Sequence, residues 1–341
     1  MLAGLGFLSV RLAARAWRYR TDMDVLSDVI AAMRTGRPHS SIRDAYAPWG
    51  VHFDTHEGAG FHVVLQGSAW LIPDREGAEP VQLGPGDVVF LAHGYGHALA
   101  SDPGAPLERF ELEPDGSWPA PPERGSVTGE GPATVLLCGA YRLDRARAHP
   151  LLSELPEVVH LPARVGAHLS LRAAVELLGA ELEEPQPGAD IIVSALLDTM
   201  LLYILRAWWL RERHGSGHPT GWSAALADPV VAAALGAVHG DPAHPWTVEE
   251  LGALAGLSRA PFARRFAATV GSPPLAYLTW WRMTTAGRLL REGDLPLRQV
   301  AERAGYTSEF AFSKAFKREF GVAPGQYRRL RPVGQPVSEV V

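Results

Sequence analysis

Two patterns of hydrophobic positions divide the chain. From about Val51 to Leu112 short apolar runs alternate with breaks that contain Gly and Pro, a pattern typical of β-strands. The runs Phe61–Gly67 and Ala69–Ile72 predict two strands with a turn near Gly67-Ser68. After about Ala163 the apolar residues recur at helical spacing. The sequence therefore predicts a multidomain α+β chain in which a small β-barrel or jelly roll precedes a helical region.

The helical region begins with one unusually apolar segment. Ser170–Leu182 predicts a first helix, and Ile191–Arg213 predicts a long helix that is apolar around much of its circumference. Asp198 and Arg206 interrupt its apolar run and would be costly in lipid. We therefore expect an interface helix rather than a membrane span, with one face on the barrel and another on a second subunit of a homodimer.

The last hundred residues contain a near-repeat. The segment 251–258 is echoed by 300–307, and in each copy a short helix, a Gly-containing turn and a second helix lead to Gly271 or Gly321. This succession is that of a helix-turn-helix. The sequence predicts two such units, at 247–271 and 297–321, joined by one long helix over Leu275–Arg291.

Local signals support both units. Thr247 and Glu250 have the spacing of a capping box. Phe262 and Phe266 are one helical turn apart, as are Phe312 and Phe316 fifty positions later, so both pairs are expected to face the core. The helical period leaves a mostly basic set of side chains outward: Arg259, Arg264, Arg265, Glu309, Ser313, Lys314 and Lys317.

Charge is distributed unevenly along the chain. The formal net charge is −5, yet residues 247–341 carry 14 Lys or Arg against 8 Asp or Glu, whereas residues 1–246 carry 18 against 29. A basic C-terminal module on an acidic body is typical of a DNA-binding domain joined to a domain with another task. We expect double-stranded DNA as a partner.

Residues 240–330 resemble the AraC/XylS-type transcription regulators. The resemblance is carried by the long stretch 305–328, which reads GYTSEFAFSKAFKREFGVAPGQYR. It implies base-reading positions at Ala260, Ala263, Arg264, Glu309, Phe310, Ser313 and Lys314. Arg264 would either pair bidentately with a guanine or contact phosphate only, and Glu309 would either accept a hydrogen bond from cytosine or reduce non-specific binding.

Residues 23–160 resemble the cupin-type sensing domain of one branch of these regulators. The stretches 47–50, 61–70, 86–91 and 138–141 carry this resemblance, together with 149–152. The implied organisation is a tail or mis-assigned start at 1–22, the cupin-like domain at 23–160, a helical dimerisation and linker region at 161–221, and the DNA-binding domain at 222–331.

The cupin resemblance implies metal-ligand positions, and the chain fills them only in part. The second cupin motif runs Gly86, Ala92 in place of Pro, Gly94 and His97, so His97 occupies a ligand position. In the first motif the usual His-x-His falls on 54–56 and the usual Glu on Gly60. His62 lies two residues further along, on the same strand face as Gly60.

Asp54, His56, His62 and His97 are therefore the candidate effector pocket, and the three histidines are the candidate metal ligands. Three interpretations are open: a divalent metal such as Zn²⁺, a metal-free pocket for a polar effector, or histidines with a structural role. Cys138, the chain's one cysteine, would be a redox-sensing thiol, a fourth ligand or an inert buried residue.

Three functions follow from these features. The first is a cytoplasmic homodimeric transcription regulator, not an enzyme, that is controlled by a small-molecule effector and able to contact RNA polymerase. The second is a metal-dependent cupin enzyme fused to a DNA-binding module, which the eroded first motif disfavours. The third is a constitutive architectural DNA binder with an inactive barrel.

Overall fold

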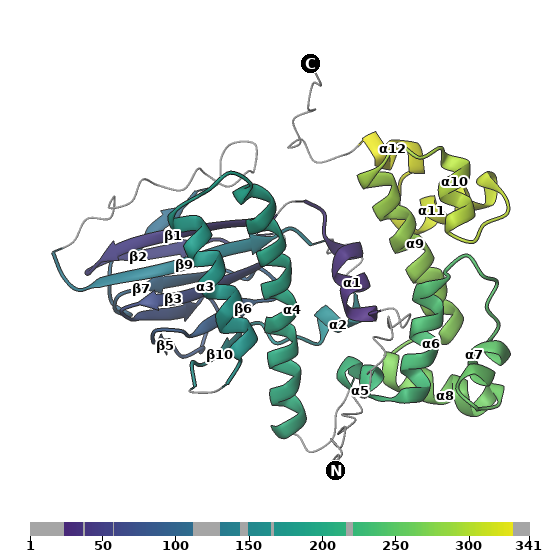
Figure 1. Cartoon of the computed structure of the whole chain (residues 1–341), viewed down its shortest axis with the longest axis horizontal. Coiled ribbons are helices and arrows are strands. Elements are labelled where there is room, and N and C mark those ends of the chain that lie inside the picture. Colours follow the sequence, from purple (N-terminus) through teal and green to yellow (C-terminus); the bar gives the residue numbers. More distant parts are fainter. Residues whose placement is uncertain are drawn as a thin grey trace, which may run out of the picture.

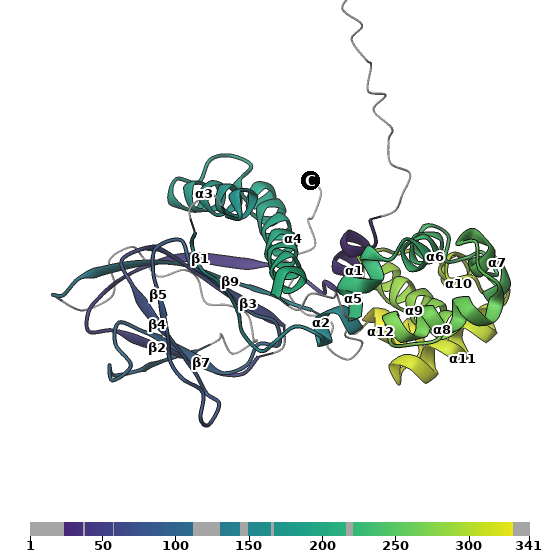
Figure 2. The same cartoon turned by 90° about the horizontal axis from the view of Figure 1, so that it is seen from below.

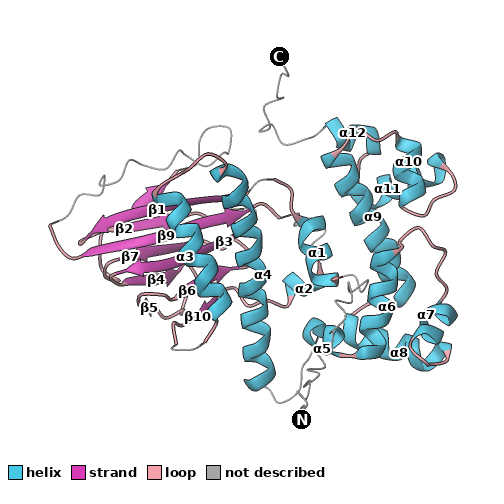
Figure 3. Ribbon diagram, in the orientation of Figure 1, coloured by secondary structure: helices cyan, strands magenta, loops and turns pink. Residues whose placement is uncertain are grey.

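A computed structural model describes residues 24–36, 38–56, 58–111, 130–143, 149–164, 167–215 and 221–329. The tail or mis-assigned start at 1–22 and the end of the predicted DNA-binding domain at 330–331 lie outside these residues. The described parts form a β-rich N-terminal unit and a helical C-terminal unit (Figure 1). Figure 3 shows this segregation of strands and helices directly.

The N-terminal unit contains two five-stranded sheets. The first has the order β1-β9-β3-β6-β10 and the second the order β5-β4-β7-β2-β8. Neighbouring strands are antiparallel except β2 and β8. The first sheet comprises β1 (His39–Tyr46), β3 (Ala59–Gln66), β6 (Val88–Leu91), β9 (Ala133–Tyr141) and β10 (Val159–Leu161). The second comprises β2 (Gly50–Phe53), β4 (Ala69–Pro73), β5 (Val81–Leu83), β7 (His97–Ala100) and β8 (Glu108–Phe110).

Strand β3 contributes side chains to the hydrophobic cores on both faces of the first sheet. Its residues alternate between faces, so Val64 joins the core between the sheets while Phe61 and Val63 join the core on the other side. A strand buried on both faces reads as a continuous apolar run, which is the pattern of its sequence. The turn after it places Gly67 at φ 77°, where a Cβ would lie 2.4 Å from the Ala133 carbonyl oxygen. This confirms the predicted turn, although β3 and β4 belong to different sheets and do not pair with each other.

Two helices cover the outer face of the first sheet. They are α3 (Leu169–Glu183) and α4 (Ala189–Gly215), which pack against each other, and Figure 2 shows both on that face. The Tyr141 hydroxyl of β9 donates to the Leu197 carbonyl of α4 at 2.8 Å. By length and composition α4 could cross a bilayer, as could the bent pair of helices that follows it if taken as one span. The packing of α4 on the sheet supports the interface-helix prediction.

The C-terminal unit is entirely helical over its described residues. After α5 (Gly221–Ala227) and α6 (Pro229–Gly240), the first helix-turn-helix consists of α7 (Val248–Leu254) and α8 (Arg259–Val270). The second consists of α10 (Leu297–Arg303) and α11 (Glu309–Phe320), and the chain continues into α12 (Pro324–Arg329). Helix α9 (Pro274–Glu292) joins the two units, as the sequence predicts.

Two short helices connect the halves. Helix α1 (Val25–Met33) precedes the first strand but packs against α6 and α9, and α2 (Pro150–Ser153) packs against α5. The Arg291 guanidinium of α9 donates to the Ala32 carbonyl at 3.0 Å. The sequence assigned residues 23–33 to the cupin-like domain and gave no sign of this contact with the DNA-binding half.

Candidate DNA interface and sensing site

The first helix-turn-helix has the predicted caps at most positions. The Thr247 hydroxyl accepts from the Glu250 N–H at 3.1 Å, and the Glu250 carboxylate accepts from the Thr247 N–H at 2.9 Å. Gly256 and Gly271 have φ of 70° and 80°, as residues that end helices in a left-handed conformation do. Ser258 precedes α8 and makes no side-chain capping hydrogen bond, so α8 begins without a side-chain cap.

The second unit repeats this geometry. Gly305 and Gly321 both have φ of 75°, and the Ser308 hydroxyl accepts from the Ala311 N–H at 3.4 Å. Phe312 and Phe316 are fully buried with ring centroids 5.6 Å apart. Phe262 and Phe266 of α8 are equally buried and 5.7 Å apart. The paired Phe residues therefore fix which face of α8 and of α11 is left for a partner.

The predicted DNA-contacting residues lie on that other face. Arg264, Lys314 and Lys317 are exposed, and within the described chain none of them forms an ion pair. Arg259 is exposed and lies 3.0 Å from a Glu249 carboxylate oxygen. Phe310 is 80% exposed, an unusual position for a large aromatic ring. The remaining predicted positions are Ala260 and Glu309, which are exposed, and Ala263 and Ser313, which are half-buried.

Arg265 is exposed, as predicted, and it also has a partner within the chain. Its Nε donates to a carboxylate oxygen of Asp228 at 2.6 Å. That carboxylate also caps α6 by accepting from the Val230 N–H at 2.9 Å. Burial opposes ionisation of Asp228, but the hydrogen bonds from Arg265 and from the backbone outweigh it and lower the pKa of the carboxyl group. Arg265 thus fastens α8 to α6.

Helix α9 sets the separation of the two units. It has 19 residues, and a helix of that length spans ~28 Å. The two helix-turn-helix units lie at its opposite ends (Figure 1). Recognition helices in successive major grooves are about 34 Å apart, so the spacer has the right order of length.

The predicted sensing histidines meet inside the β-rich unit. His62 of β3 and His97 of β7 are 4% and 2% exposed, and their Nε2 atoms lie 2.8 Å apart. His62 Nδ1 lies 3.1 Å from Cys138 Sγ, and His97 Nδ1 lies 2.9 Å from the Tyr95 carbonyl oxygen. Four groups from three segments of the chain thus form one series of contacts, which we call the barrel relay.

The partners of the barrel relay assign its protons. A carbonyl can only accept, so His97 carries its proton on Nδ1 and accepts at Nε2. His62 must then donate from Nε2 and accept at Nδ1 from the Cys138 thiol. Burial lowers the pKa of His62 well below its usual value and that of His97 to about 4, and burial raises the pKa of Cys138 to about 12. All three groups are therefore neutral near pH 7.

Two other predicted residues are placed less favourably for a metal. Asp54 has a half-exposed side chain whose carboxylate accepts two hydrogen bonds from Arg109, each at 2.9 Å. His56 is half-buried beside Gly60. Among the described residues no group of three or more His, Cys, Asp or Glu side chains is arranged to hold a metal ion. A metal on His62 and His97 would have to break the bond between them, so the residues present do not fit a cupin metal site.

A second buried relay lies where the halves meet, and the sequence did not indicate it. The His149 Nδ1 accepts from the Leu151 N–H at 3.1 Å, so His149 donates from Nε2 to the Tyr277 hydroxyl, 3.3 Å away. That hydroxyl then donates to His239 Nε2 at 2.7 Å. The His239 Nδ1 faces an Asp28 carboxylate oxygen at 3.4 Å. Helices α2, α9, α6 and α1 are linked in this order, and we call the set the interdomain relay.

Comparison with known proteins agrees with this architecture. A cupin family profile matches residues 24–209, and a helix-turn-helix domain profile matches residues 251–330. An AraC-like transcription regulator of Streptomyces antibioticus is 38% identical over 90% of this chain and 99% of its own length. The HTH-type transcriptional regulator MtrA of Neisseria gonorrhoeae is 33% identical over 82% of this chain and 90% of its own length.

Among solved structures, the DNA-binding domain of AdpA in complex with a target DNA is similar to the C-terminal part. It is 36% identical, with a TM-score of 0.29, over 31% of this chain and 99% of that chain.

Proposed function

We propose that this chain, which belongs to the AraC-type transcription regulators, contacts two adjacent stretches of duplex DNA through α8 and α11. Members of this family are DNA-binding proteins and not enzymes. The observation that carries the proposal is the fifty-residue offset between the two helices. Arg264 and Lys314 are fifty residues apart, like the buried Phe pairs, so they occupy equivalent positions on α8 and α11, on the face opposite those rings. Both cations are exposed and lack an acidic partner within the described chain. One cation on each recognition face is what two phosphate or base contacts require.

The two helices are expected to read unequal amounts of sequence. Around Arg264 the outward positions are the alanines 260 and 263, which offer no hydrogen bond. Around Lys314 they are Glu309, Phe310 and Ser313. We therefore propose that α11 supplies at least as much base reading as α8. Swapping base pairs under each half-site and comparing the affinity losses tests this, and a larger loss under α8 contradicts it.

Fluorescence anisotropy with a duplex from the region upstream of a neighbouring promoter tests DNA binding itself. We expect Arg264→Ala together with Lys314→Ala to weaken binding at least tenfold, because a good base contact is worth about 1–3 kcal/mol. Arg298→Ala is the matched control, since Arg298 is exposed on α10 and paired with Glu302 at 2.9 Å. An unchanged affinity in the double variant would refute the proposed interface.

The same titrations separate the two roles open to Arg264. If it contacts only phosphate, Arg264→Ala weakens binding to all sequences alike and lowers the salt slope by about one. If it pairs with guanine, the loss is confined to the specific site and specificity relaxes at one base pair.

We further propose that the regulator is a cytoplasmic homodimer that is able to contact RNA polymerase. Large apolar side chains are exposed on the α3–α4 hairpin: Leu169, Leu177, Ile191, Ile192 and Leu210. An exposed apolar surface of this kind is typical of a protein interface. Light scattering after size exclusion should give a dimer, and Leu177→Glu with Ile191→Glu should give a monomer. A parent protein that is monomeric at micromolar concentration would exclude this interface.

We propose finally that a small polar effector controls the regulator by binding at His56, His62 and His97. The support is the barrel relay, in which two neutral imidazoles offer one donor and one acceptor that a ligand could take over. An effector acts only if it binds the two functional states with different affinity. A thermal-shift screen of metabolites and metals on the parent protein and His97→Ala tests this. Stoichiometric Zn²⁺ in the purified protein would favour a metal in place of the polar effector.

A further inference from the structure

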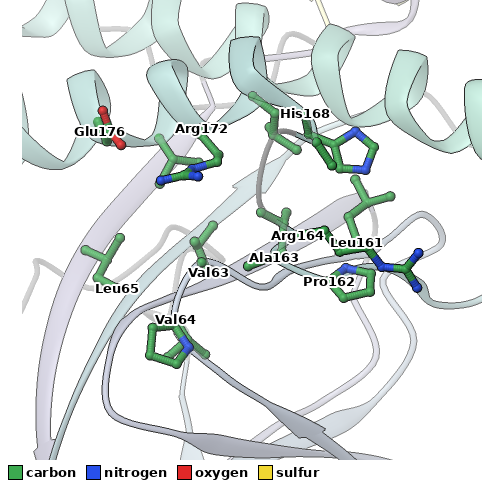
Figure 4. Close-up of a pocket in the computed structure, with 16 residues that line it drawn as sticks. Val63, Val64, Leu65, Leu161, Pro162, Ala163, Arg164, His168, Arg172 and Glu176 are labelled. Carbon is green, nitrogen blue, oxygen red and sulfur yellow. The ribbon is translucent and has the colours of Figure 1, made fainter.

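A cavity lies outside the barrel, between α3 and the outer face of the first sheet. Its volume is about 380 Å³, within the range of small-molecule sites. It is separate from the barrel relay, because alternate residues of β3 point to opposite faces. His62 faces the space between the sheets, whereas Val63 and Leu65 face α3 (Figure 4). We call this cavity the α3 pocket.

The floor and roof of the α3 pocket are apolar. Val63 and Leu65 come from β3 and Val88 from β6, while Leu171 and Val175 come from α3. Together these side chains leave no hydrogen-bonding group on the inner surface that they form. Such a lining favours an apolar ligand body.

The edge of the pocket is basic. Arg164 lies on the segment between β10 and α3, and Arg172 projects from the first turns of α3 towards the sheet (Figure 4). Both side chains are exposed, and neither forms an ion pair within the described chain. His168 and Glu176 complete this edge. Two guanidinium groups against one carboxylate leave a net positive charge beside an apolar space.

A buried carboxylate holds one wall of the pocket in place. Asp87 accepts from the Ala163 N–H at 2.7 Å and lies 3.1 Å from His160 Nε2. The preceding residue, Gly86, has φ of 85°, and a Cβ there would meet the Ala163 side chain at 3.0 Å. The turn and the segment after β10 are therefore fastened together, which makes the wall preformed rather than created by a ligand.

We propose that the α3 pocket binds a small monocarboxylate with a compact apolar body. The carboxylate would lie on Arg172, because a guanidinium pairs bidentately with a carboxylate. The apolar body would lie between Val63 and Val175. A phosphate monoester fits less well, because Glu176 repels its second negative charge. The pocket's role as an effector site rests on the proposed regulatory function, whereas ligand binding itself does not.

The position of the pocket would allow such a ligand to affect the proposed dimer interface. Helix α3 packs along α4, and these two helices carry the exposed apolar side chains of the proposed dimer interface. A ligand body wedged under α3 would therefore act on the hairpin at which subunits meet. Binding would shift the monomer–dimer equilibrium to the extent that it differs between the two states.

Calorimetric titration of the full chain tests the proposal. The probes are octanoate and 2-naphthoate, with 1-octanol as the uncharged analogue and octyl phosphate as the dianionic one. We expect a carboxylate to bind best, and Arg172→Gln to weaken its binding at least tenfold while leaving the weak binding of the alcohol unchanged. Arg75→Gln is the matched control, since Arg75 is 72% exposed on the same domain and pairs with Glu157. It should bind as the parent does.

Ala167→Trp supplies an independent arm, since residue 167 lines the pocket and an indole there would fill it while both arginines remain. Loss of carboxylate binding in this variant supports the pocket, and retained binding overturns it. Binding weaker than about 1 mM for both carboxylates also overturns it. Binding abolished by His97→Ala but not by Arg172→Gln would place the ligand in the barrel. DNA anisotropy on the same preparations reports separately whether the regulatory function holds.

Discussion

The interdomain relay leads to the sharpest prediction, because a single atom, the Tyr277 hydroxyl oxygen, contacts both His149 and His239. Tyr277→Phe removes the hydroxyl that accepts from His149 and donates to His239 and leaves the ring in place. All three side chains are nearly inaccessible, with exposed fractions of 2%, 0% and 4%. Water therefore cannot replace the lost hydroxyl without opening the junction of α2, α6 and α9.

The expected cost follows from the two contacts. Leaving a buried donor or acceptor without a partner costs about 1–3 kcal/mol. The contact to His239, at 2.7 Å, is short, and the contact to His149, at 3.3 Å, is long. We therefore expect a total loss of about 3 kcal/mol, mostly from His239. A domain of ordinary stability has about 5–15 kcal/mol in all.

Urea denaturation of the full chain, followed by tryptophan fluorescence and by circular dichroism, measures this loss. Tyr203→Phe is the matched control, because Tyr203 is half-buried on α4 and its hydroxyl makes no hydrogen bond within the described chain. Its effect should stay within about 0.5 kcal/mol. Equal stabilities for Tyr277→Phe and Tyr203→Phe would show that the relay hydroxyl contributes nothing.

Three further outcomes follow. Asp228→Asn removes the charge that holds Arg265, so we expect a loss of about 0.5–1 kcal/mol near neutral pH. The lowered pKa of the Asp228 carboxyl group adds stability that is lost as the pH falls through the folded-state pKa, so the difference from the parent should vanish at still lower pH. A loss independent of pH in urea titrations would contradict the ion pair. Gly321→Ala should lower the free energy of unfolding by about 1–2 kcal/mol. The reason is the left-handed backbone alone, because a Cβ at this position would meet nothing within 4 Å. Gly84→Ala is the control, since Gly84 is equally open but has no positive φ, and equal melting temperatures for the two variants would refute the prediction. The buried Cys138 thiol, with its pKa raised to about 12, should react with a disulfide reagent at about pH 8 only after unfolding; fast reaction in the native protein would exclude an inert thiol.

The sequence could predict those features that depend on neighbours in the chain. The Thr247–Glu250 capping box, the turn glycines and the paired Phe residues act within a few positions of one another, and the structure contains all of them. Strand alternation likewise placed His62 on the inner face of β3. The cupin motif placed His97 at a ligand position, and the rings of His62 and His97 do lie in contact.

Features that join distant segments could not be predicted from such patterns. His149 and Tyr277 are 128 positions apart, and Arg265 and Asp228 are 37 apart. Helical periodicity placed Arg265 outward correctly, but no local signal indicates which carboxylate lies across from it. The α3 pocket could not be predicted either, because its lining comes from β3, β6 and α3, and the sequence of each of these elements is typical of ordinary core.

The position of α1 has a consequence for synthesis. Its buried residues Val25, Val29 and Met33 pack on helices that follow much later, since α9 begins at Pro274. A ribosome adding about 5–20 residues per second needs roughly 10–50 s to make that stretch. During this interval the first helix of the described chain has an apolar face and no final partner. The apolar face of α1 therefore has to be kept from aggregating until the C-terminal half of the nascent protein emerges.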